Sequence, residues 1–120
     1  MGNLAQRSMD EEQRNVLKKI KEVILSIARK HGIEVDKIIL FGSRARGDYR
    51  EESDLDVLVV TREKLDKNKK YEFIHEARRK IVWEIDRPVD IIVVSRKYHE
   101  DFKNVYGSIP GMATLEGYVI

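Results

Sequence analysis

Two short apolar runs constrain the fold of this chain more than any other feature of the sequence. They are residues 54–60 (DLDVLVV) and 88–94 (PVDIIVV), and about 27 residues separate them. Apolar side chains recur at helical spacing over residues 66–85, with basic side chains on the other faces, which predicts a connecting helix. A strand, a helix and a strand joined in this way form a right-handed crossover, so the two strands are expected to be parallel neighbours.

The remaining elements are predicted from capping signals and periodicity. Ser8 and Glu11 form a capping-box pattern, and apolar residues then recur at helical spacing as far as Gly32, which predicts a long amphipathic helix. Residues 37–41 are expected to form a buried strand, which the short polar connection to residues 54–60 makes antiparallel to the next one.

The C-terminal part gives weaker signals. Ser95 is expected to cap a short helix that runs to about Asn104. Residues 106–120 (YGSIPGMATLEGYVI) give no assignment. The order of elements predicts an α/β (α+β) fold, with a small mixed β-sheet flanked by helices.

Composition limits the classes of function. The chain has 120 residues, 42% hydrophobic and 37% charged, which suits a single domain; residues 10–120 are expected to form it, after an extension or vector remnant at residues 1–9. Lys and Arg number 23 against 21 Asp and Glu, so any site for a polyanion must be local. The absence of cysteine and of a long apolar stretch predicts a cytoplasmic protein without a membrane partner.

Acidic residues stand where two of the predicted strands begin. Asp54 and Asp56 are two residues apart and so point to one face, and Asp90 is the third residue of the parallel neighbour. Gly42 and Ser43, which end the antiparallel strand, arrive at the same end of the sheet. Glycine allows a phosphate to approach the backbone closely, and clustered carboxylates are tolerated when divalent cations lie between them. The sequence therefore predicts a metal site beside a phosphate site.

The sequence also contains other candidate ligands and one tryptophan. Asp86 is a nearby competitor for the role of Asp90, although strand alternation favours Asp90. His31, His75 and His99 lack metal-ligand spacing and are expected at the surface or at helix caps. Trp83 is expected in the core or in an interface.

The stretch GSRARGDYREESDLDVLVV resembles the signature of the polymerase-beta-like nucleotidyltransferases, in which Gly-Ser precedes Asp-x-Asp and a third acid follows on a later strand. Ala45, Arg46, Gly47 and Ser53 extend the match to the minimal nucleotidyltransferases (MNT) of that superfamily. The resemblance covers almost the whole chain from about Asp10.

The resemblance implies transfer of a nucleoside monophosphate from a nucleoside triphosphate to an acceptor hydroxyl, with two Mg²⁺ ions as cofactors and ATP as the expected substrate. It places Asp54 and Asp56 on both ions, and Asp90 on the catalytic ion, where it also helps to deprotonate the acceptor. The residues expected at the nucleotide are Gly42, Ser43, Arg46 and Ser53.

The resemblance also implies a partner. Minimal members commonly act as antitoxins of a HEPN toxin, in some cases by adding AMP to a tyrosine of that toxin. A HEPN-type partner protein is therefore expected here, with a homo-oligomer as an alternative support for the acceptor. Two other functions stay open: a binding module that neutralises a toxin without catalysis, and a small enzyme that adds nucleotides to RNA through a basic helix face.

Overall fold

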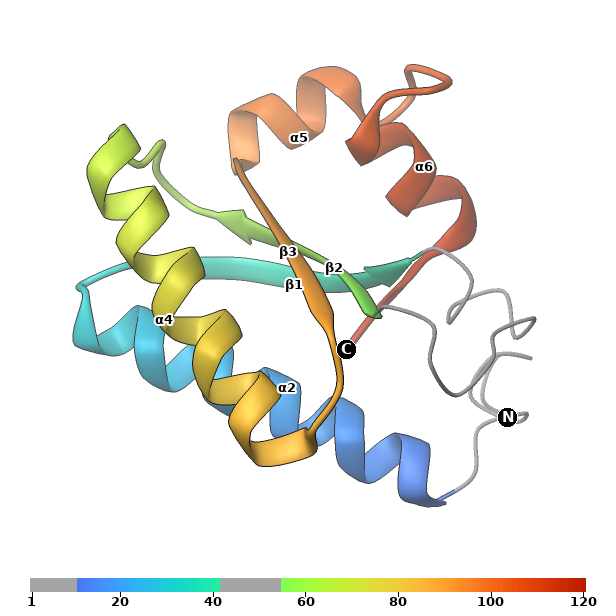
Figure 1. Ribbon diagram of the computed structural model, residues 1–120. Helices are drawn as coiled ribbons and strands as arrows, with labels where there is room; N and C mark the ends of the chain where they lie inside the picture. Colours follow the sequence, from blue (N-terminus) through green and yellow to red (C-terminus); the bar gives the residue numbers. More distant parts are fainter. Residues whose placement is uncertain (1–10, 42–54) are drawn as a thin grey trace.

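The computed structural model describes residues 11–41 and 55–120 (Figure 1). In these residues one four-stranded mixed sheet has the strand order β3-β2-β1-β4. The elements are α2 (Glu11–Lys30), β1 (Val35–Phe41), β2 (Leu55–Thr61), α4 (Lys67–Ile85), β3 (Val89–Ser95), α5 (Arg96–Phe102), α6 (Ile109–Glu116) and β4 (Tyr118–Val119). The predicted mixed sheet with flanking helices is confirmed, and no helix within the described ranges is long and apolar enough to cross a membrane.

The crossover that the sequence predicts is present. Strands β2 and β3 are parallel neighbours, in register from the pair Leu55 and Val89 to the pair Thr61 and Ser95. Strand β1 is antiparallel to β2, and its last residue, Phe41, pairs with Asp56. The helix between β2 and β3 starts where the sequence places it, because the Asp66 side chain accepts a hydrogen bond from the Lys69 amide and caps α4.

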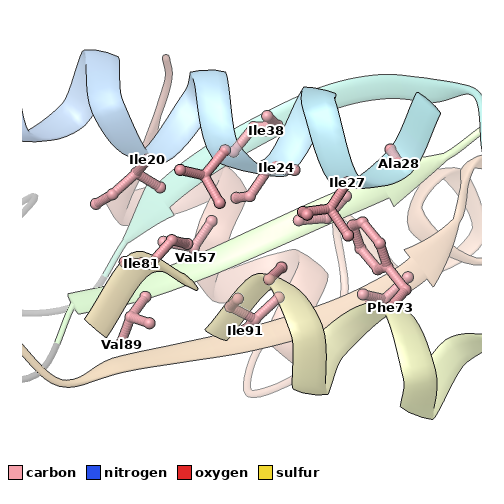
Figure 2. Packing of buried hydrophobic residues seen from close by; sticks show 14 of the residues in the cluster. Ile20, Ile24, Ile27, Ala28, Ile38, Val57, Phe73, Ile81, Val89 and Ile91 are labelled. Carbon is pink, nitrogen blue, oxygen red and sulfur yellow. The ribbon is translucent and has the colours of Figure 1, made fainter. Parts of the chain in front are cut away.

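The sheet has two differently covered faces. Helices α2 and α4 lie together on one face (Figure 1), where Ile24 and Phe73 pack on alternate strand residues such as Val57 (Figure 2). Helices α5 and α6 lie on the opposite face, where Ala113 packs beside Leu58. Because strand side chains alternate between faces, the even-numbered residues of β2 and β3 all lie on the α5–α6 face.

The C-terminal residues, unassigned from the sequence, form α6 and the short edge strand β4. The Ser108 hydroxyl accepts a hydrogen bond from the Gly111 amide and caps α6, which has a proline in its first turn. Gly117 then brings the chain onto β1: a Cβ at this position would lie 2.6 Å from the Leu40 oxygen. Glycine is required there by close packing, since its φ of −96° suits any residue.

Three local predictions need correction. The short helix expected to reach Asn104 ends at Phe102. Of the two alternatives for Trp83, the core is wrong, because this residue of α4 is 86% exposed, whereas the interface stays a prediction. The prediction of a surface position for His99 is wrong. His99 is the fourth residue of α5, which turns it toward the sheet, and it is only 3% exposed.

Candidate functional site

Two carboxylates meet at one edge of the sheet. Asp56, the second residue of β2, is the register partner of Asp90, the second residue of β3. Register partners in adjacent strands point to the same face, and neighbouring strands lie roughly 4.8 Å apart, so the two side chains leave the sheet side by side. The structure thus brings together two of the three acids that the sequence analysis singled out.

The start of β3 fixes this alignment. Asp86 ends helix α4 in a left-handed conformation, with φ 54°, and its amide donates to the Val82 oxygen at 2.9 Å. Two residues later the Pro88 carbonyl accepts a hydrogen bond from the Leu55 amide at 3.3 Å, which begins the parallel ladder. Proline at this point needs no amide partner, so β3 can start there. The chain therefore enters β3 in the register that sets Asp90 against Asp56.

Asp86 and Asp90, the two candidates for the third acid, occupy different positions in the fold. Asp86 serves as the C-cap of α4, outside β3, whereas Asp90 is a strand residue aligned with Asp56. The left-handed region is rare for residues other than glycine, and Asp is one of the few that adopt it. The structure explains Asp86 by this helix-ending role and leaves Asp90 as the acid beside Asp56.

The pair lies at the boundary between the core and solvent. Asp90 is exposed and Asp56 is half-buried, while Phe41, the partner of Asp56 on its other side, is buried. Leu58 and Ile92 follow on the same face and continue into the apolar packing under α6. One wall beside the carboxylates is therefore apolar, and a partly dry environment strengthens the electrostatic interactions of a bound ion.

The donor set suits a hard divalent cation. Carboxylate oxygens are the ligands that Mg²⁺ takes from proteins, usually one or two carboxylates completed by water and substrate phosphates. Among the described residues, no group of three or more His, Cys, Asp or Glu side chains is positioned to hold a metal ion. Asp56 and Asp90 offer carboxylate oxygens of the kind that such an ion takes together with phosphate oxygens.

Five predicted site residues lie outside the described residues: Gly42, Ser43, Arg46, Ser53 and Asp54. The segment that contains them joins Phe41 to Leu55, the residues that end β1 and begin β2.

Sequence reasoning missed the C-terminal helix that covers the face of the carboxylates. Signals for it exist: Ser108 is followed by Pro110 at the first turn, and Gly117 follows the last helical residue. Because α6 is short and apolar around most of its circumference, its sequence shows no helical period.

The sequence of this chain is similar to those of known nucleotidyltransferases. The family model described as "Polymerase beta, Nucleotidyltransferase" matches residues 15–108. The putative protein adenylyltransferase MJ0604 of Methanocaldococcus jannaschii is 54% identical over 46 residues, 38% of this chain and 46% of the relative. The putative protein adenylyltransferase MJ0141 of the same organism is 42% identical over 64 residues, 53% of this chain and 62% of the relative. The chain thus spans less than two thirds of either curated relative.

A solved structure of a putative minimal nucleotidyltransferase has the same fold. It is 26% identical in sequence, with a TM-score of 0.55, and the alignment covers 94% of this chain and 98% of the other.

Proposed function

Because the chain belongs to the polymerase beta nucleotidyltransferase family, we propose that it is a magnesium-dependent enzyme that transfers AMP from ATP to a hydroxyl group of a partner protein. The observation that carries this proposal is the register pairing of Asp56 with Asp90. The two relatives named as adenylyltransferases of proteins support the choice of nucleotide and of acceptor class.

The proposed reaction is an in-line displacement at the α-phosphorus of ATP. A bond forms between the acceptor oxygen and this phosphorus, the bond to the bridging oxygen breaks, and pyrophosphate leaves. Bound at Asp56 and Asp90, with Asp54 as the third ligand, Mg²⁺ would neutralise the phosphate charge and favour loss of the hydroxyl proton. Asp90, the more exposed carboxylate, accepts that proton and orients the acceptor. Gly42 and Ser43 bind the terminal phosphates, and Arg46 and Ser53 complete the nucleotide site.

The partner in this proposal is a HEPN-type toxin, and the chain is its antitoxin. The match of Ala45, Arg46, Gly47 and Ser53 to the minimal nucleotidyltransferase pattern supports this class, as does the likeness to a minimal nucleotidyltransferase over nearly its whole length. In this proposal residues 10–120 form one domain, and the partner protein presents the acceptor hydroxyl to its surface.

A labelling experiment tests the proposal. The purified chain is incubated with Mg²⁺ and ATP labelled at the α-phosphate in an extract of the organism that encodes it. Wild type should label a protein band, which mass spectrometry then identifies. Asp56→Asn and Asp90→Asn should each reduce the label about a hundredfold or more. Each removes a carboxylate that would hold Mg²⁺, and the ion would stabilise the negative charge of the phosphate in the transition state.

The matched control is Asp86→Asn, an acid four residues from Asp90 that caps α4. Asparagine tolerates the left-handed conformation, so this variant should fold and keep full activity. Toxin neutralisation that persists in folded Asp56→Asn and Asp90→Asn variants would favour the non-catalytic antitoxin. Label on RNA in place of protein would favour nucleotide addition to RNA.

A further inference from the structure

A hollow of about 530 Å³ opens at the other end of β3 from Asp90. It lies between the start of α4, the end of β3 and the helices α5 and α6, and Figure 1 shows α4 and α5 on either side of this end of β3. Six apolar residues line it: Leu65, Ile92, Val93, Val94, Tyr98 and Ile109. We call this feature the β3 hollow.

The β3 hollow and the carboxylates are connected along one strand. Asp90, Ile92 and Val94 are every second residue of β3 and therefore lie in one row on the α5–α6 face of the sheet. Strand geometry puts Asp90 and Val94 about 13 Å apart along this row. The hollow reaches Ile92, and Asp90 is the next residue of the same row, two positions away along β3.

β3 is also an edge strand. In the sheet formed by the described residues it pairs with β2 on one side only. An edge strand offers its outer amide and carbonyl groups to an added strand, so an extended peptide segment matches both the shape and the hydrogen-bonding groups of this row.

The rim of the hollow is basic. Lys64, Lys70 and Lys97 line it, together with a single acid, Asp101. Lys97 donates to Asp101 at 3.2 Å, whereas neither Lys64 nor Lys70 forms an ion pair with any part of the chain that the structure describes. A segment that carries acidic residues beside an apolar anchor complements this combination of rim and floor.

Two other occupants fit less well. A second copy of this chain on a two-fold axis would bring the lysine rim against an identical lysine rim. An RNA strand would gain from the lysines, but RNA recognition depends on stacking of unpaired bases, and Tyr98 is the one aromatic side chain lining the hollow. The floor of Leu65, Ile92, Val94 and Ile109 instead suits aliphatic or aromatic protein side chains.

We propose that the β3 hollow docks the protein that receives AMP, by binding an extended, acidic segment of it through one apolar anchor. The row from Val94 to Asp90 then sets the reaction site: the acceptor hydroxyl belongs to a residue about four positions from the anchor, since an extended chain advances roughly 3.3 Å per residue. This inference rests on the proposed function and adds the surface that selects the acceptor.

The test compares variants in the transfer reaction with the purified acceptor protein. Ile109→Ser alters the hollow, and Val82→Ser on α4 is its matched control, because Ile109 is 38% and Val82 39% exposed. The double charge reversal Lys64→Glu, Lys70→Glu is matched by Lys18→Glu, Lys21→Glu, two exposed lysines of α2 outside the hollow. Thermal melting checks the fold of each variant, and the lysine pair keeps the test valid if Ile109→Ser misfolds.

The hollow variants should raise the KM for the acceptor about tenfold, the size expected for loss of an interface anchor or of close charge pairs. Their kcat and their affinity for a fluorescent ATP analogue should match wild type, because the carboxylate pair is untouched. The lysine pair should also weaken the dependence of KM on salt. The two control variants should behave as wild type.

Each remaining outcome decides against the inference in a different way. If wild type transfers no AMP to any protein, the proposed function itself is wrong. If wild type transfers AMP but hollow and control variants have equal KM values, the function stands and the docking site is wrong. A wild-type dimer that Ile109→Ser dissociates in sedimentation would assign the hollow to a second copy, and label on RNA that only the lysine pair removes would assign it to RNA.

Discussion

Asp56 on β2 and Asp90 on β3 are register partners in a parallel strand pair, and both lie on the sheet face opposite α2 and α4. Two carboxylates at this spacing suit a divalent cation between them. An ion bound there would link stability to metal concentration, which can be measured apart from catalysis.

The first prediction concerns metal binding. Added Mg²⁺ or Mn²⁺ should raise the thermal midpoint of the wild-type protein, because an ion that binds only the folded state stabilises it by about 2.7 kcal/mol at a concentration of 100 Kd. Asp90→Asn should lose most of this rise. In metal-free buffer of low ionic strength it should melt no lower than wild type, since it removes one of two neighbouring charges. Asp86→Asn should keep the whole metal-dependent rise, and an Asp90→Asn protein that also keeps it would exclude Asp90 as a ligand.

The alignment of these acids could be predicted because each step depends on local sequence. Asp66 caps the crossover helix, Pro88 opens the following strand, and strand alternation selects Asp90 over Asp86. The crossover rule then fixes the strands as parallel neighbours. The rest of the predicted site, including Asp54 and Ser43, lies outside the described residues, so its geometry stays a prediction.

The C-terminal elements could not be predicted in the same way, because contacts with β1 decide them. The helix α6 is apolar around most of its circumference and short, so no period of 3.6 is visible in its sequence. Strand β4 has two residues, Tyr118 and Val119, and exists through pairing with Leu40 and Ile39. The burial of His99 likewise depends on how the seven-residue helix α5 packs against the sheet.

A second prediction tests the approach of the C-terminal segment to β1. Gly117→Ala should destabilise the protein by about 1–3 kcal/mol, because its new Cβ would lie 2.6 Å from both the Leu40 and the Ala113 oxygens, and backbone must move to make room. Met112→Ala, at a side chain of α6 that is 38% exposed, should cost less. Urea unfolding curves measure both. Equal midpoints for Gly117→Ala and wild type would show that the segment does not pack this closely.

A third prediction tests the core between the crossover helix and the sheet. Phe73 on α4 is fully buried among residues of α2 and of the strands (Figure 2). Phe73→Ala should therefore lower the free energy of unfolding by about 3–5 kcal/mol, through lost burial and the cavity it leaves. Tyr71→Ala, two residues away on the same helix but at a side chain that is 63% exposed, is the matched control and should change it by less than about 1 kcal/mol. Similar losses for the two variants, measured in urea, would contradict the packing described here.

The last prediction concerns pH and rests on His99, which is 3% exposed and whose Nδ1 has no hydrogen-bond partner within residues 11–41 and 55–120. Burial lowers the pKa of His99 below its ordinary value of 6.5, and the positive charges of Lys37 and Lys103 act in the same direction against Glu100 and Asp36. The folded protein therefore holds this imidazole neutral, whereas the unfolded chain takes up a proton as the pH falls through about 6.5.

The sign of the pH effect follows from this difference. Stability should be unaffected by His99 well above pH 6.5 and should be lost progressively as the pH falls below it, until the folded-state pKa is reached. His99→Leu, which cannot take up a proton, should flatten the fall in unfolding free energy between about pH 7 and pH 5. Urea unfolding at a series of pH values measures the slopes. An unchanged slope in a folded His99→Leu protein would mean that His99 is protonated equally in the folded and unfolded states, which its burial against α5 and the sheet argues against.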